Sequence, residues 1–188
     1  MRAKKNTLKK IIYPFLILCL IFIGAASNPY DEKKHARIFY GTLNKASKLI
    51  EKKYKLIPTG SGGKAFCGPI TRFSLSFDIN APLSRNQLRN ILVHSSKDFL
   101  AIVNTDKEVQ PYLAQKPFAL ENIEVIIFNN DKSGREVFDP LIAVAKISDG
   151  ILNFRTEDPE KKIFIKNNYK ETYEEALKII QGSEKITP

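Results

Sequence analysis

The sequence predicts an α+β fold, a mainly antiparallel sheet of about four to five strands with helices packed on one face. Apolar residues recur at three- and four-residue steps in residues 36–57 and 88–103, the spacing of a helix with one buried face. Other segments alternate apolar and polar residues or form short apolar runs, which is typical of strands. Their order is α-β-α-β-β-β-β-α, and without repeated βα alternation an antiparallel sheet covered by helices is expected.

The chain begins with a segment typical of an export signal. MRAKKNTLKK holds five basic residues and no acidic one, and residues 11–26 are sixteen positions without a charge that end in Gly24, Ala25 and Ala26. This run is shorter than the roughly 20 residues that cross a bilayer as a helix. We expect residues 1–27 to be a signal peptide or an N-terminal membrane anchor. The protein is then exported across, or anchored in, the cytoplasmic membrane of a bacterium.

Residues 28–188 are predicted to form a single α+β globular domain. About 160 residues suffice for one hydrophobic core, and no repeat or linker-like composition divides them. Cleavage near Ser27 or Asn28 leaves Cys67 as the only cysteine, which excludes an internal disulfide. We expect Cys67 to be a small buried hydrophobic residue, with pairing to another chain as the alternative.

The first predicted helix has an apolar stripe and an opposite basic face. The stripe comprises Ala36, Phe39, Leu43, Ala46, Ile50, Tyr54 and Ile57. The basic face comprises Lys34, Arg37, Lys45, Lys48, Lys52 and Lys55. A solvated exterior explains such a face, but six cations with few acidic neighbours also suit an electrostatic contact. The sequence leaves both interpretations open; if the face binds a partner, we expect an anionic surface, either lipid headgroups or an envelope polymer.

GSGGK, residues 60–64, follows this helix and invites comparison with a phosphate-binding loop. A Walker-type loop has a glycine where Pro58 stands and a hydroxyl where Ala65 stands. It also lies between a strand and a following helix, whereas here a helix comes first and a strand follows. We expect the glycines to form a flexible connection at the helix C-terminus and to bind no nucleotide.

A strand and a second amphipathic helix come next. In residues 71–79, Phe73, Leu75 and Phe77 alternate with polar residues, as in a half-buried strand. The second helix begins with a capping box, because Gln87 follows the predicted N-cap Ser84 by three positions. Its apolar face comprises Leu88, Ile91, Leu92, Ser95, Phe99, Ile102 and Val103.

Four strands and a closing helix are predicted in the second half of the chain. The strands are residues 122–128, 141–148, 151–155 and 161–167, and the helix is residues 172–180. Asp149 and Gly150 join two strands in a hairpin, because Asp-Gly suits a two-residue turn with positive φ. Thr172 and Glu175 have the spacing of a second capping box.

Cys67 and His94 are the residues from which a catalytic alternative can be built. A thiol and an imidazole from separate elements can meet through folding and act as nucleophile and base. No histidine or cysteine spacing here matches a zinc-ligand signature. The alternative function is therefore a small secreted or periplasmic hydrolase whose site is assembled from scattered residues.

Residues 129–140, NNDKSGREVFDP, resemble part of a calcium-binding loop. Asn129, Asp131 and Ser133 match the first three ligand positions, and they are the candidate metal ligands of this chain. Pro140, however, stands where such a loop needs a bidentate glutamate. We expect a turn between strands, in which Asn, Asp and Gly serve for their backbone tolerance, and no metal or other cofactor.

These observations favour a non-catalytic exported module, one that binds a ligand or is associated with the envelope, over an enzyme. The export signal, the basic helix face and the absence of catalytic spacing support this prediction. Its expected partner is an anionic membrane surface or envelope polymer, with a protein partner as a further option. No nucleic acid is expected, because the aromatic residues of 72–77 lie on the buried side of a predicted strand. An effector that acts on other cells would have the same sequence features.

Overall fold

A computed structural model of the protein describes residues 31–65, 68–161 and 164–184. By its internal contacts the chain divides after Lys33, and the fold below is that of the second part, Lys34–Pro188. The predicted signal or anchor, residues 1–27, and Cys67 lie outside the described residues. None of the described helices is long and apolar enough to cross a membrane.

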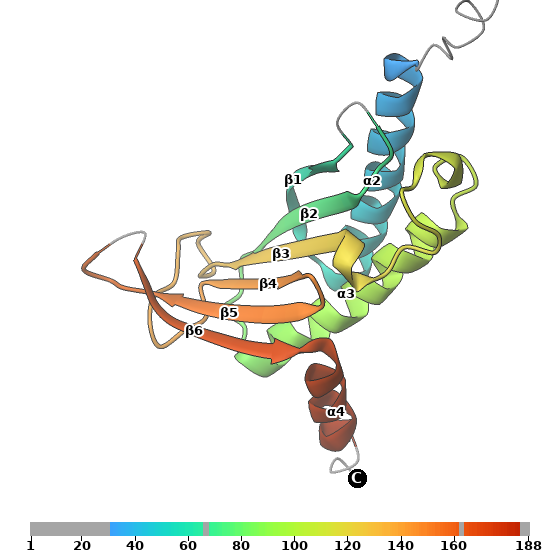
Figure 1. The fold of residues 1–188 in the computed structure, drawn as a ribbon. Helices are drawn as coiled ribbons and strands as arrows, with labels where there is room; N and C mark the ends of the chain where they lie inside the picture. The colour runs from blue at the N-terminus through green and yellow to red at the C-terminus, as the bar shows by residue number, and fades with distance from the viewer. Residues whose placement is uncertain (1–30, 66–67, 162–163, 185–188) are drawn as a thin grey trace, which may run out of the picture. The chain divides into compact units, whose positions relative to one another are not determined.

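The described residues form an α+β structure, which confirms the predicted class (Figure 1). The α-helices are α2 (Glu32–Tyr54), α3 (Arg85–Thr105) and α4 (Tyr173–Glu184). The strands are β1 (Ile57–Lys64), β2 (Arg72–Ile79), β3 (Ile123–Asn129), β4 (Val144–Ser148), β5 (Ile151–Glu157) and β6 (Ile165–Thr172). Short 3₁₀ helices at Gln110–Tyr112 and Leu120–Asn122 lie between α3 and β3.

The six strands form one mixed sheet in chain order, β1-β2-β3-β4-β5-β6. Neighbouring strands are antiparallel except β2 and β3, which run parallel. The expectation of about four to five strands in a mainly antiparallel sheet is therefore correct only in part. The parallel pair arises because α3 connects β2 to β3 and returns the chain to the same end of the sheet.

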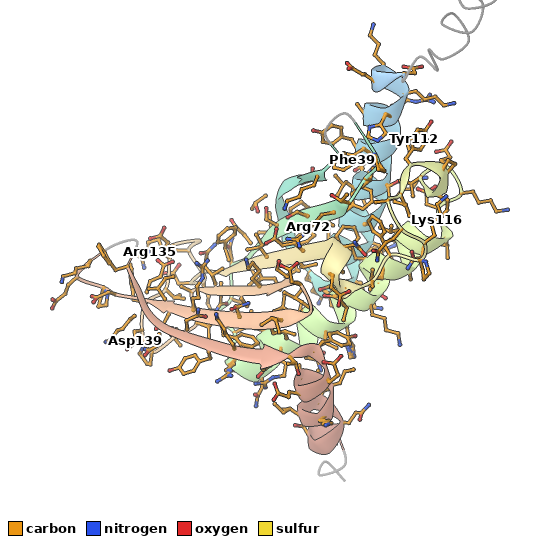
Figure 2. The ribbon with its side chains drawn as sticks, in the orientation of Figure 1. Phe39, Arg72, Tyr112, Lys116, Arg135 and Asp139 are labelled. Carbon is orange, nitrogen blue, oxygen red and sulfur yellow. The ribbon has the colours of Figure 1, made fainter. Side chains whose placement is uncertain are left out.

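Helices α2 and α3 lie across the same face of the sheet, while α4 lies at the end of β6 (Figure 1). The core fills the layer between helices and sheet. Phe39 of α2, labelled in Figure 2, stacks on Phe73 of β2 with 5.0 Å between ring centroids. Phe73 also meets Phe99 of α3. The opposite face of the sheet is mixed: Glu124 accepts a hydrogen bond from Ser74, and Ile126 and Val144 belong to a second, smaller apolar cluster.

Helix α2 confirms the predicted helix and most of its apolar stripe. Four stripe residues are buried: Phe39, Leu43, Ala46 and Ile50. Ala36 is exposed, and Ile57 belongs to β1 instead of the helix. The helix ends at Tyr54 because Lys55 has a φ of 56°, which turns the chain toward β1.

The glycine segment is a strand, so the predicted flexible connection is wrong. β1 pairs antiparallel with β2 from Ile57 to Lys64, with a shift of register between Pro58 and Gly60. A Cβ at Gly63 would lie 2.1 Å from the backbone oxygen of Arg72, and one at Gly60 would lie 2.7 Å from Oγ of Ser76. Glycine disfavours strands locally, but here it lets two backbones come close together.

The local signals in α3, the hairpin and α4 are confirmed. Ser84 and Gln87 form the capping box of α3. Asp149 and Gly150 have φ angles of 53° and 72°, as the turn between β4 and β5 requires. The second capping box is present at the start of α4, where the backbone N–H groups of Thr172 and Glu175 donate to each other's side chains. β6 begins and ends later in the chain than the strand predicted at residues 161–167.

Candidate binding groove and basic helix face

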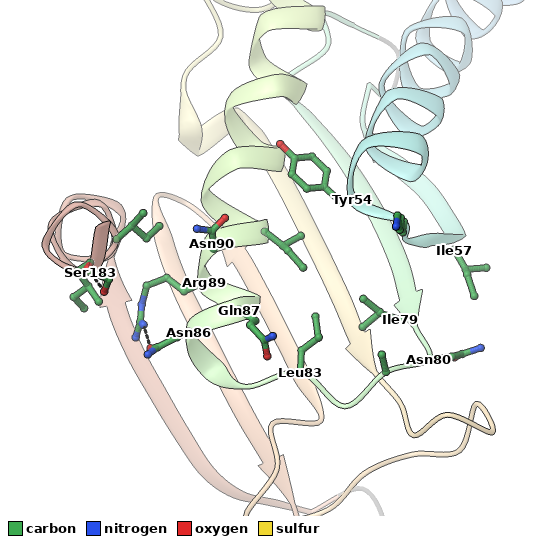
Figure 3. A pocket seen from close by; sticks show the side chains of 15 residues that line it. Tyr54, Ile57, Ile79, Asn80, Leu83, Asn86, Gln87, Arg89, Asn90 and Ser183 are labelled. Carbon is green, nitrogen blue, oxygen red and sulfur yellow. Dashed lines mark hydrogen bonds between the residues drawn. The ribbon is translucent and has the colours of Figure 1, made fainter. Parts of the chain in front are cut away.

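A groove of about 850 Å³ crosses the N-terminal half of α3 (Figure 3). Its walls come from the end of α2, the start of β1, the segment after β2, α3 and α4. Its apolar lining includes Ile57, Ile79, Leu83, Ile91, Ile179 and Ile180. Its polar lining includes Tyr54, Lys55, Asn86, Gln87, Asn90 and Ser183. Among the described residues that line the groove there is no carboxylate.

The apolar lining is open to solvent at both ends of the groove. Ile57, at the start of β1, is 48% exposed, and Ile179 of α4 is 41% exposed. Branched apolar side chains are usually buried, and sites for small molecules are concave, mostly apolar and about 300–1,000 Å³ in volume. The groove therefore has the size and character of a ligand site.

A buried ion cluster lies behind the α4 side of the groove. Arg89 of α3 donates from Nε to Glu171 Oε1 at 2.5 Å and from Nη2 to Oε2 at 2.9 Å. Both residues are almost wholly buried. Arg85 donates to the same Oε2 at 3.3 Å, and Nη1 of Arg89 donates to Asn86, as the dashed line in Figure 3 shows.

This cluster carries one more positive charge than negative charge. Two guanidinium groups, from Arg85 and Arg89, share the single carboxylate of Glu171. Arg85 also lies over the ring of Tyr169, 4.8 Å from its centroid, and its buried Nε has no hydrogen-bond partner among the described residues. Arg89 uses three of its five N–H donors in these bonds. Arg89, which lines the groove, therefore keeps two N–H donors for a further hydrogen-bond acceptor, whereas Arg85 is not among the lining residues.

The predicted basic face of α2 is interrupted by Lys45. Its Nζ lies 2.9 Å from Asp106 and 3.8 Å from Glu108, just beyond the end of α3. The hydrogen bond to Asp106 raises the pKa of Lys45. Burial favours a raised pKa for Asp106, but hydrogen bonds from Lys45 and Thr42 outweigh burial and lower it. Lys45 therefore links α2 to the end of α3.

A second link between the two helices is formed by Lys53, which lies beside the predicted face. Lys53 Nζ and the Tyr54 hydroxyl donate to the same oxygen of Asp98, at 2.7 and 2.6 Å. These hydrogen bonds outweigh the effect of burial and lower the pKa of Asp98. Burial and the bond to Asp98 together raise the pKa of Tyr54 above its usual range.

The remaining cations of the predicted face lie on the surface. Lys34 is exposed in the first turns of α2. Arg37, Lys48, Lys52 and Lys55 are exposed and take part in none of the ion pairs found among the described residues. The structure thus leaves most of the predicted basic face available for contact with an anionic partner.

The candidate catalytic pair cannot be assembled from the described residues, because Cys67 lies outside them. His94 is exposed on α3, one turn before Asp98. It does not line the groove. Asp98 already accepts hydrogen bonds from Lys53 and Tyr54.

The three candidate calcium ligands hold the chain in place between β3 and β4. Asn129 is buried; its side chain accepts from the backbone N–H of Leu83 and donates to the carbonyls of Leu83 and Ile142. Asp131 accepts from the hydroxyl and backbone N–H of Ser133, and these bonds lower the pKa of Asp131. The described part of the chain has no group of three or more His, Cys, Asp or Glu residues suited to a metal.

The groove residues are those that sequence reasoning missed. Ile91 belongs to the predicted apolar face of α3. That it lines a groove depends on where α2 and α4 end, which local sequence patterns do not reveal. Arg89 follows Leu88 directly, next to the apolar face of the helix. A charged residue at such a position is the sequence feature that could have indicated a buried ion cluster. Comparisons with protein-family models, curated proteins and solved structures found no match.

Proposed function

We propose that this protein is a non-catalytic binding module, exported to or anchored in a bacterial envelope, whose groove takes an amphiphilic ligand. The ligand has an apolar chain and an anionic head. The observation that carries the proposal is the open groove of about 850 Å³, lined by isoleucine and leucine side chains and backed by an ion cluster with excess positive charge.

The two parts of the ligand match two parts of the groove. Ile57, Ile79 and Leu83 on one side of α3 offer apolar surface that a hydrocarbon chain would cover. Burial of apolar area stabilises such a complex by about 25 cal/mol per Å² before the costs of association. Lys55 supplies positive charge for the head, and Arg89, whose charge is paired with Glu171, supplies its remaining N–H donors; the described lining has no carboxylate.

The described lining also favours binding over hydrolysis. Its hydroxyl groups belong to Tyr54, which donates to Asp98 outside the lining, and to Ser183, which donates to the carbonyl of Ile179. The described lining itself contains no histidine, cysteine or carboxylate to act as general base. The alternative hydrolase built on Cys67 and His94 gains no support from the groove, since His94 is exposed and is not among its lining residues.

The expected location rests on the N-terminal segment, and the basic face fits that location. Arg37, Lys48 and Lys52 are exposed on α2, where an anionic membrane surface or envelope polymer would meet them. Each lysine or arginine contributes about 1 kcal/mol near such a surface. A module held at the membrane in this way would be close to a supply of amphiphilic ligands.

The groove is tested with a fluorescent fatty acid and the matched fatty alcohol, titrated into the full-length chain held in lipid nanodiscs of neutral phospholipid. We expect saturable binding of the acid and weaker binding of the alcohol. Ile91→Gln and Ile179→Gln each remove apolar contact and should weaken binding about tenfold. Leu141→Gln is the control, because Leu141 is 44% exposed and lies outside the groove. Equal binding by the control and groove variants, or none by the parent chain, overturns the proposal.

The basic face is tested separately with anionic and neutral vesicles. Replacing Arg37, Lys48 and Lys52 with glutamine should abolish a salt-sensitive preference for anionic vesicles, while Lys132→Gln, in the turn after β3, should preserve it. If vesicle binding changes neither with salt concentration nor in the triple variant, the basic face of α2 is only a solvated surface.

A further inference from the structure

β1 is an open edge of the sheet. In an antiparallel pair, alternate residues direct their N–H and C=O groups away from the partner strand. β1 pairs with β2 on one side, and among the described residues no strand pairs with its other side. A row of backbone donors and acceptors is therefore available for an added strand.

The outer edge of β1 has little to repel such a strand. Its residues are IPTGSGGK, in which Lys64 at the far end is the only charged residue. Glycines at positions 60, 62 and 63 have no side chains that could obstruct an incoming backbone. Pro58 lacks an N–H but lies near the start of the strand, so the stretch that follows it can still pair.

A second groove, of about 590 Å³, runs between this edge and α2. β1 contributes Gly60 and Ser61 to it, and α2 contributes Arg37, Tyr40, Gly41 and Asn44. A Cβ at Gly41 would meet nothing within 4 Å, so the helix side of the groove has open space. An extended chain added to β1 would direct every second side chain toward this groove.

The charge around this edge is positive. From Arg37 to Lys55 the chain has six basic residues and one acidic residue, Glu51, and two of the six, Lys45 and Lys53, are paired with carboxylates of the α3 region. Arg37 lines the groove, and Lys48 lies on an adjacent exposed part of α2. No carboxylate is among the described residues that line this groove.

We propose that β1 and the adjoining face of α2 form a docking site for an extended, acidic segment of another protein, which adds to the sheet as a further strand. Main-chain hydrogen bonds to β1 supply affinity, and Arg37 with Lys48 selects acidic side chains. A second copy of this chain is a poorer occupant, because it would bring the same positive charge to the interface. The first thirty residues of the chain contain five basic and no acidic residues, so they lack the complementary charge too.

The site is tested with a fluorescein-labelled decapeptide of alternating glutamate and valine, titrated into the full-length chain in nanodiscs of neutral phospholipid. We expect binding of this peptide and none of its lysine-valine counterpart. Two further peptides carry N-methyl groups on either the valine or the glutamate amides. Because an added strand uses alternate amides on one edge, one of the two methylated peptides should lose binding and the other should keep it.

Variants of the chain separate a strand-addition site from general charge attraction. Arg37→Glu should weaken binding of the acidic peptide by about tenfold or more, whereas Lys132→Glu, an equal charge change in an exposed turn, should leave it unchanged. The proposal is overturned if the acidic peptide does not bind, or if both methylated peptides bind as well as the parent. It is also overturned if the chain forms a dimer that the peptide dissociates, because a second copy is then the occupant.

Discussion

The two edges of the sheet are built in opposite ways. β1 has three glycines and no charged residue before its final Lys64, whereas β6 has two exposed cations within the strand, Lys166 and Lys170. Charged side chains on an edge strand discourage pairing with another chain, and their absence permits it. The comparison indicates that the charges of β6 discourage the addition of a strand at that edge, whereas β1 can accept one.

The edges also differ in how they are attached to the helices. β6 is joined to α3 by the buried ion cluster of Glu171 with Arg85 and Arg89. β1 is attached through close backbone contact, since a Cβ at Gly63 would lie 3.1 Å from Cζ of Phe39 in α2. One edge depends on charge pairing and the other on the absence of side chains, so substitutions should affect them through different mechanisms.

The largest effect should come from removing the carboxylate at the β6 edge. Glu171→Gln leaves two arginines without their counter-charge, and breaking a buried pair in this way costs about 3–5 kcal/mol in the free energy of unfolding. Urea denaturation of the parent and variant chains measures the change. The double variant Glu171→Leu with Arg89→Met should recover part of this loss, because the unpaired cation that remains is Arg85, whose side chain is partly exposed, and not the buried Arg89. A loss below about 1 kcal/mol in the single variant would mean that the cluster does not hold β6.

A smaller loss is expected at the β1 edge. Gly63→Ala places a Cβ against the backbone of Arg72, so β1 must shift, and overpacking of this kind typically costs about 1–3 kcal/mol. Gly62→Ala is the matched control, because a Cβ there would meet nothing within 4 Å. Hydrogen exchange of β1 amides, together with urea denaturation, distinguishes the two. Equal effects of the two substitutions would show that strand propensity, not close approach, governs this edge.

The attachment of α2, which flanks the β1 edge, should weaken at acid pH. Asp98 and Asp106 have lowered pKa values in the folded protein because Lys53, Tyr54, Lys45 and Thr42 donate to them. Their contribution to stability is thus complete above the unfolded pKa of about 3.9 and is lost as the pH falls through the lower folded pKa. Denaturant unfolding from pH 7 to pH 2 measures this loss, and Asp98→Asn should make the profile shallower. An unchanged profile in that variant would contradict the role of the Asp98 link.

The smallest effect is expected at the turn into β1. Lys55 has a φ of 56°, a left-handed conformation that costs an ordinary residue about 1–2 kcal/mol. Lys55→Gly removes this strain but adds chain entropy to the unfolded state, so the net stabilisation should be about 0.5 kcal/mol. The thermal midpoint should rise slightly. Lys52→Gly, inside the same helix, should instead destabilise the protein by about 1 kcal/mol.

The elements that the sequence determined by itself are those whose signals lie within a few residues of one another. Ser84 with Gln87, and Thr172 with Glu175, form their capping boxes across three positions. Asp149-Gly150 alone defines the turn between β4 and β5. Alternation in residues 71–79 predicted β2 and its buried side. These features need no distant partner, because a few neighbouring dihedral angles and side chains account for their stability.

The tertiary structure alone decided the features that join distant residues. The glycines of β1 become a strand only because β2 pairs with them. Lys45 leaves the basic face because Asp106, 61 residues away, lies within hydrogen-bond reach. Arg89 enters the groove wall because Glu171, 82 residues away, neutralises it there. Local propensity is worth about 1 kcal/mol or less per residue, whereas pairing and burial of distant groups are worth more, so long-range contacts overrode the local pattern at these sites.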